Sequence, residues 1–145
     1  MRTMLFVVLP LAWATAATAA PPAGKLMKSD DGNCQMRVPG DWSSSYTGGM
    51  GLPGSRSHVF LYQQEESLPA RREIIARTGQ VEKTFEDSAS RYWVEIRSHS
   101  DMRAWNVVVP ASGGDCYAEI TFDSKLSEAD AKTIALSVQQ QAKTT

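Results

Sequence analysis

Residues 31–42, with the sequence DGNCQMRVPGDW, decide the fold of this chain together with a distant partner, Asp115–Phe122, with the sequence DCYAEITF. Each stretch alternates apolar and polar residues, which is typical of a half-buried β-strand. Each stretch also carries one of the two cysteines, Cys34 and Cys116, on its apolar side. We therefore expect two strands that face a common core and are joined there by a disulfide.

The first 20 residues have the pattern of a secretory signal peptide. A basic start at Arg2 is followed by an apolar run over residues 4–14 and by an Ala-x-Ala site at Ala17 and Ala19. The alternative is a membrane anchor, but the apolar run is shorter than the roughly 20 residues that span a bilayer. We therefore expect residues 1–19 to be a cleaved signal peptide that leaves no transmembrane anchor.

Export also bears on the two cysteines. In an oxidising compartment Cys34 and Cys116 are expected to form a disulfide, whereas two buried free thiols are the alternative. The chain is expected to be periplasmic or secreted. With 15 basic and 16 acidic residues it is nearly neutral, so no nucleic-acid partner is expected.

The rest of the chain indicates an α+β domain. Residues 20–29 lack periodicity and are expected to be a flexible mature N-terminus, whereas residues 30–142 are expected to form a single domain. Strands of an antiparallel sheet are predicted over residues 33–38, 58–62, 81–85, 91–98, 104–109 and 116–122. The glycine- and serine-rich residues 43–57 are predicted to be a mobile surface loop.

Two segments have helical spacing. Residues 68–78 fit a short helix, but their run of Glu73-Ile74-Ile75-Ala76 also fits a strand, so both possibilities stay open. Ser127 resembles a helix cap. The helix that follows it places five apolar residues on one stripe, which can cover the apolar face of the sheet: Ala131, Ile134, Ala135, Val138 and Ala142.

The residues that carry chemistry do not form a recognisable catalytic motif. The two histidines, His58 and His99, lie beside no nucleophile motif, and a structural zinc site needs about four Cys or His ligands. We therefore expect that the protein is not an enzyme and that it binds no metal and no cofactor. A hydrolase with paired carboxylates stays open, because any two of the acidic residues could meet in space.

Trp93 is the most unusual residue of the predicted sheet. It lies on the polar side of its strand beside Arg91, Glu95 and Arg97, opposite Tyr92, Val94 and Ile96. If that face is open to solvent, an aromatic residue framed by charges is typical of a binding patch. If a helix or loop covers the face, Trp93 is part of the scaffold.

The strand that ends in Val38-Pro39-Gly40-Asp41-Trp42 resembles the "vPxgW" opening of PsbP-like and DcrB-like domains. The order of elements over residues 30–141 is also similar. The resemblance implies an α-β-α sandwich around an antiparallel sheet, with Val38, Pro39 and Trp42 as a structural motif. It further implies a non-catalytic family whose members act mostly through protein partners. The cysteine pair is not part of the general pattern of that family.

Together these features favour an exported, non-enzymatic binding or accessory domain that acts through a protein or an envelope component. One alternative is a carrier or sensor that holds a small apolar ligand between sheet and helix. A second alternative is a small envelope hydrolase. A binding module should expose aromatic side chains, a carrier should contain an apolar pocket, and an enzyme should contain a cleft with pKa-shifted groups.

Overall fold

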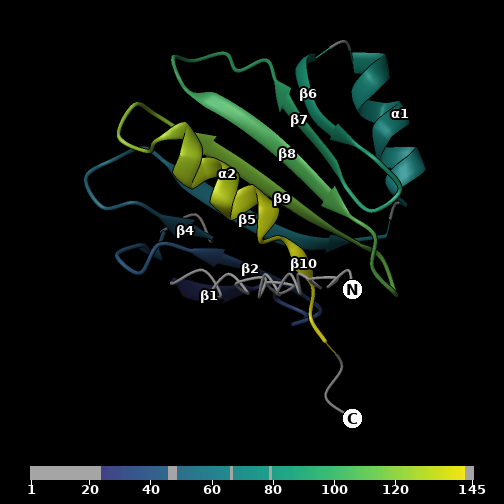
Figure 1. Cartoon of the computed structure of the whole chain (residues 1–145), viewed down its shortest axis with the longest axis horizontal. Coiled ribbons are helices and arrows are strands. Elements are labelled where there is room, and N and C mark those ends of the chain that lie inside the picture. The colour runs from purple at the N-terminus through teal and green to yellow at the C-terminus, as the bar shows by residue number, and fades with distance from the viewer. Residues whose placement is uncertain (1–23, 46–48, 66, 79, 143–145) are drawn as a thin grey trace, which may run out of the picture.

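The computed structural model describes residues 24–45, 49–65, 67–78 and 80–142 (Figure 1). The expected signal peptide, residues 1–19, and residues 20–23 lie outside this part of the chain. The described residues form two helices, α1 (Leu68–Thr78) and α2 (Glu128–Leu136). They also form ten strands: β1 (Lys25–Lys28), β2 (Cys34–Val38), β3 (Ser43–Ser44), β4 (Met50–Gly51), β5 (His58–Gln64), β6 (Val81–Asp87), β7 (Tyr92–Ile96), β8 (Arg103–Val109), β9 (Asp115–Phe122) and β10 (Gln139–Gln140).

The fold is mostly antiparallel sheet, as expected. Seven strands form a large sheet in the order β3-β4-β5-β9-β8-β7-β6, and three form a small sheet in the order β1-β2-β10. Every described strand pair is antiparallel. The two stretches that were expected to organise the chain occupy the centres of these sheets, β2 in the small one and β9 in the large one.

The disulfide joins the two sheets. Cys34 on β2 and Cys116 on β9 are bonded, with their Cα atoms 5.5 Å apart, and both side chains are fully buried. On both strands, every second residue after the cysteine lies in the same hydrophobic core as the disulfide, because side chains alternate between the two faces of a strand. On β2 these are Met36 and Val38, and on β9 they are Ala118, Ile120 and Phe122. The expected pairing and the expected faces are confirmed.

Helix α2 packs on this same face of the large sheet, in front of β9 and β5 in Figure 1. Its start is fixed by Ser127, whose hydroxyl accepts a hydrogen bond from the Asp130 backbone N–H at 3.0 Å. Such a cap satisfies one of the free N–H groups of the first turn. Ala131, Ile134 and Ala135 are then buried against the sheet, as predicted.

The expected end of this helix, at Ala142, is wrong. The helix stops at Leu136, and Ser137 binds β2 instead, where its hydroxyl accepts a hydrogen bond from the Arg37 backbone N–H at 2.8 Å. Gln139–Gln140 then pairs with the free edge of β2 as β10. The hydrogen bonds offered by this strand edge replace those of a further helical turn.

Helix α1 covers the opposite face of the large sheet, where it forms a second apolar cluster. Leu68 and Ile75 of the helix pack with Tyr92, Val94, Val108 and Tyr117 of β7, β8 and β9. This settles the ambiguity of residues 68–78 in favour of a helix. The central strands are therefore covered on both faces, by α2 and the small sheet on one and by α1 on the other.

Two segments are more ordered than predicted. Lys25–Lys28 is strand β1, paired with β2 so that Met27 lies opposite Met36, and the expectation of a flexible segment is wrong for these residues. Ser43–Ser44 and Met50–Gly51 extend the large sheet beyond β5, so the predicted mobile loop is wrong there as well. Burial of Met50 in the main core explains this order. Residues 46–48 lie outside the described residues.

Within the part of the chain that the structure describes, we find no helix that is both long and apolar enough to cross a membrane.

Candidate functional site

Trp93 does not form an exposed patch. Its side chain is 6% exposed and lies in the main core, with ring centroids 4.5 Å from Phe85 and 5.2 Å from Trp105. Of the two possibilities for Trp93, an open binding patch or a covered scaffold residue, the buried side chain agrees with the second. The polar neighbours of Trp93 suggested a solvent face, but a strand that is covered on both sides has no such face.

The two arginines beside Trp93 have different surroundings. Arg91 donates hydrogen bonds to the carbonyl oxygens of Leu136 and Val138, both at 3.2 Å, where α2 ends. A cation at this position satisfies free carbonyl groups and complements the negative end of the helix dipole. Arg97 lies on the surface and pairs with Glu82 at 3.1 Å. Arg91 is thus part of the scaffold.

Glu95 belongs to an ion-pair network between the sheet and α2. Arg103 donates two hydrogen bonds to its carboxylate, at 3.1 and 2.6 Å, and the Trp105 indole N–H donates a third at 3.0 Å. The hydrogen bonds from Arg103 lower the pKa of Glu95. Arg103 also binds Glu128 of α2 at 2.6 Å. The Glu95 carboxylate therefore helps to anchor α2 on the sheet. The structure does not bring Trp93, Arg91, Glu95 and Arg97 together as a binding site.

The motif of the family resemblance is structural in this chain. Val38 and Trp42 are buried in the main core, and the Trp42 backbone N–H donates to the Pro39 carbonyl at 3.1 Å. Lys25 of β1 donates to the Trp42 carbonyl at 2.6 Å. The turn after β2 thus folds the indole back over the end of the core.

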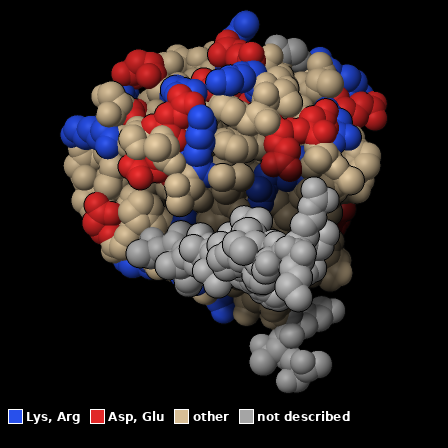
Figure 2. Space-filling view, in the orientation of Figure 1, with Lys and Arg blue, Asp and Glu red and all other residues tan. Residues whose placement is uncertain are grey.

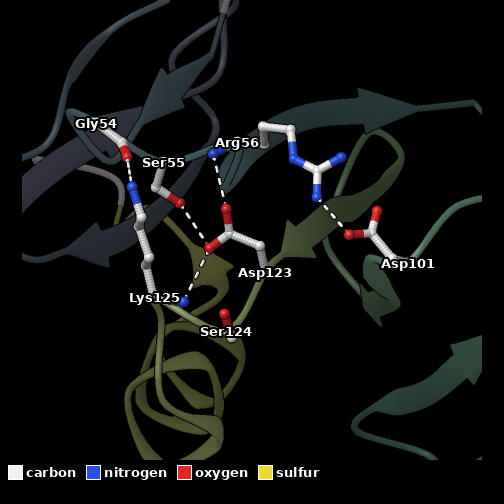
Figure 3. Close-up of a pocket in the computed structure, with 7 residues that line it drawn as sticks. All are labelled: Gly54, Ser55, Arg56, Asp101, Asp123, Ser124 and Lys125. Atoms are coloured by element: carbon white, nitrogen blue, oxygen red, sulfur yellow. Dashed lines mark hydrogen bonds and ion pairs between the residues drawn. The ribbon is translucent and has the colours of Figure 1, made fainter.

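A polar cleft of about 620 Å³ lies between the loop before β5 and the segment after β9 (Figure 3). Asp123 organises it, because its carboxylate accepts hydrogen bonds from the backbone N–H groups of Arg56 and Lys125, at 3.0 and 2.9 Å, and from the Ser55 hydroxyl at 2.8 Å. Arg56 in turn pairs with Asp101 at 2.7 Å. Lys125 donates to the Gly54 carbonyl.

The electrostatics of this cleft do not suit acid catalysis. The N–H and hydroxyl donors hold the pKa of Asp123 well below its usual range, and Arg56 lowers the pKa of Asp101. A general acid needs a pKa near the working pH, whereas both of these carboxylates stay ionised. The two acidic and two basic side chains that line the cleft also give it no net charge. The cleft can make polar contacts, but its side chains chiefly hold two loops together.

Among the described residues, sequence reasoning missed a row of aromatic side chains that is partly exposed at the surface. His58, Phe60 and Tyr62 alternate along β5 on the face opposite the main core, and Tyr62 lies beside Tyr117 of β9. Successive ring centroids are 5.3, 6.2 and 5.9 Å apart. We call these four residues the aromatic row. Tyr62 is 39% exposed, whereas Val59 and Leu61, which alternate with the row, are buried.

The sequence of β5 contains a pattern that would have predicted the aromatic row. The segment HVFLYQQ looks uniformly apolar at its start, and that favoured a buried strand. A finer distinction separates the two faces, because the aliphatic residues take one set of alternate positions and the aromatic residues take the other. Aromatic rings with a polar tip are suited to a partly wet surface.

The sequence matches no protein-family model. It also matches no curated protein. The resemblance to PsbP-like and DcrB-like domains therefore depends on the motif Val38-Pro39-Gly40-Asp41-Trp42 and on the order of the elements.

Proposed function

We propose that this protein is an exported, non-enzymatic binding or accessory domain that acts through a protein or envelope partner, and that the aromatic row is its contact surface. The observation that carries the proposal is the partial exposure of the row at Tyr62. Large aromatic side chains are enriched at the centres of protein interfaces, where they bury much area with little loss of conformational entropy.

The position of the row supports this role. Helix α1 covers the part of this face formed by β7, β8 and Tyr117, while His58, Phe60 and Tyr62 on β5 lie outside that cluster. Arg71 of α1 stacks over the Tyr117 ring at 4.7 Å, and the Tyr117 hydroxyl donates to Glu119 at 3.2 Å. These contacts hold the buried end of the row rigid, which lowers the entropic cost of binding.

Export is supported by the disulfide. A buried bridge between the two sheets is compatible with an oxidising compartment and uncommon in a reducing one. Figure 2 shows the α2 side of the molecule, where basic and acidic side chains are interspersed; the aromatic row lies on the opposite side of the large sheet. The placement of α1 and α2 on opposite faces of the large sheet supports a PsbP-like α-β-α sandwich, which we propose as the fold family.

The test is partner capture from the native envelope with the mature, oxidised protein. Tyr62→Ala removes an exposed ring of the row. Leu136→Ala is the matched control, because Leu136 is also a large apolar residue, is 54% exposed, and lies on α2 away from the row. We expect Tyr62→Ala to lose the partner and Leu136→Ala to keep it, with unchanged melting temperatures for both. Equal capture by both variants would exclude the row as the contact surface.

A second candidate function, a carrier or sensor of a small ligand, is favoured by one observation. A pocket of about 570 Å³ with partly apolar walls lies between the first turn of α1 and one end of the large sheet. This volume lies within the usual range for small-molecule sites.

A further inference from the structure

The pocket beside α1 is built from three parts of the chain that are distant in sequence. Leu68 and Pro69 come from the first turn of the helix, Ala89 from the turn between β6 and β7, and Pro110 and Asp115 from the end of β8 and the start of β9. In Figure 1 these segments meet where β5 ends and β9 begins. The walls therefore combine apolar side chains with polar and charged ones, and one of their two carboxylates, that of Asp115, lies at the start of a central strand.

Asp115 is the unusual residue of this pocket. Asp115 is only 7% exposed. Its Oδ1 atom accepts one hydrogen bond, from the Ala111 backbone N–H at 3.3 Å. Its Oδ2 atom is buried and has no hydrogen-bond partner among the described residues. A buried carboxylate oxygen without a donor is costly, so a donor that reached it would be bound favourably.

The one described cation of the pocket is already engaged. Arg72 forms an ion pair with Asp87, donates to the Ser88 carbonyl at 3.4 Å and stacks over the Tyr92 ring at 5.3 Å. With two carboxylates and one guanidinium, the lining has a net negative charge. An anionic ligand would therefore be repelled by Asp115, while a cationic ligand would be attracted.

The first turn of α1 does not reverse this preference. Pro69 has no N–H, and the Arg71 N–H donates to the Ser67 carbonyl at 3.0 Å, so two of the usual donors of a helix start are not offered to a ligand. A metal ion also fits poorly, because the described residues contain no group of three or more His, Cys, Asp or Glu side chains that could hold one.

We propose that this pocket binds a small organic cation, in which an ammonium group donates to Asp115 and a compact apolar body lies against Leu68, Pro69 and Pro110. The inference depends on the second candidate function and not on the aromatic row. Loss of the partner in Tyr62→Ala and loss of the cation in an Asp115 variant are therefore separate outcomes.

The test uses hexylammonium as the probe, with hexanoate and hexanol as matched molecules of opposite and zero charge. Each is titrated into the mature, disulfide-bonded protein, and binding is followed by the backbone amide signals in two-dimensional NMR spectra. We expect hexylammonium to shift the signals of Leu68, Ala89 and Asp115 and to bind more tightly than hexanol. Hexanoate should bind most weakly of the three.

Two variants assign the effect to the pocket. Asp115→Asn should weaken hexylammonium binding by about ten- to a hundredfold, the usual value of a hydrogen bond to a charged group. Asp41→Asn, which removes an exposed carboxylate that does not line the pocket, should leave binding unchanged. Ala89→Trp, at an exposed turn, should block the pocket by volume if Asp115→Asn fails to fold.

Three results would overturn the proposal. The first is the absence of shifts at the pocket with hexylammonium, and the second is equal affinity for hexanoate. The third is unchanged hexylammonium binding in Asp115→Asn or, where that variant does not fold, in Ala89→Trp.

Discussion

Replacing both Cys34 and Cys116 by alanine removes the covalent link between β2 and β9, and the structure gives the size of the effect. The bridge joins residues separated by 82 positions. In the loop-entropy model, releasing a loop of this length costs about 4.5 kcal/mol at room temperature. Because both side chains are fully buried, the missing sulfur atoms leave a void that adds to this loss.

The assay is urea unfolding followed by tryptophan fluorescence. Three forms are compared: the oxidised protein, the reduced protein and the Cys34→Ala/Cys116→Ala variant. Reduced protein is the control, since it keeps both sulfur atoms and loses only the link. The free energy of unfolding should fall by about 4.5 kcal/mol on reduction, which is about a third or more of the roughly 5–15 kcal/mol typical of a domain. A fall below about 1 kcal/mol would refute the idea that this bridge constrains the unfolded chain.

Three further predictions concern the residues around β7 and α2. Trp93→Ala should lower the free energy of unfolding by about 3–5 kcal/mol in urea, because the ring is buried; a negligible change would contradict its place in the core. Arg91→Ala should lower the melting temperature more than Arg97→Ala, whose cost should stay within about 0.5 kcal/mol, because the Arg91 side chain is 18% exposed and that of Arg97 is 67% exposed. The opposite order would show that Arg91 does not hold the end of α2. Hydrogen bonding to Arg103 lowers the pKa of Glu128 from 4.5 to about 2. This depressed pKa stabilises the fold above pH 4.5, and the contribution is lost as the pH falls toward 2. Glu128→Gln should therefore flatten the acid side of a melting-temperature profile, and coincident acid limbs would contradict the network.

Much of the fold was predictable because strong local patterns agreed with each other. Alternation in β2 and β9 fixed which side chains face the core, and it placed Cys34 and Cys116 on the same side. The stripe of Ala131, Ile134 and Ala135 indicated a helix that covers the sheet. Each of these features depends on neighbours within a few residues, which a single sequence contains.

The differences arise where distant strands decide the local structure. Nothing within Gln139–Gln140 favours a strand, and its pairing is set by the free edge of β2, about a hundred residues earlier in the chain. Lys25–Lys28 is ordered by the same strand. The polar neighbours of Trp93 on β7 suggested solvent, but that face is covered by elements from elsewhere in the chain.

The candidate sites were less predictable than the fold. To predict the aromatic row, the aliphatic positions of β5 had to be distinguished from its aromatic positions. His58 alone gave no reason to do so. The pocket beside α1 combines Leu68, Ala89 and Asp115, which only the strand order brings together. Their proximity depends on pairing between β5, β8 and β9, which local periodicity does not reveal.

The central claim, that the protein binds its partner through the aromatic row, is tested most directly by site-specific photo-crosslinking in the native envelope. A photoreactive phenylalanine analogue replaces Tyr62 in one protein and Leu136 in another, both exposed positions. We predict one discrete crosslinked product from position 62, absent from position 136 and suppressed by excess unlabelled protein. Equal crosslinking from both positions, or a product from position 136 alone, would contradict the claim.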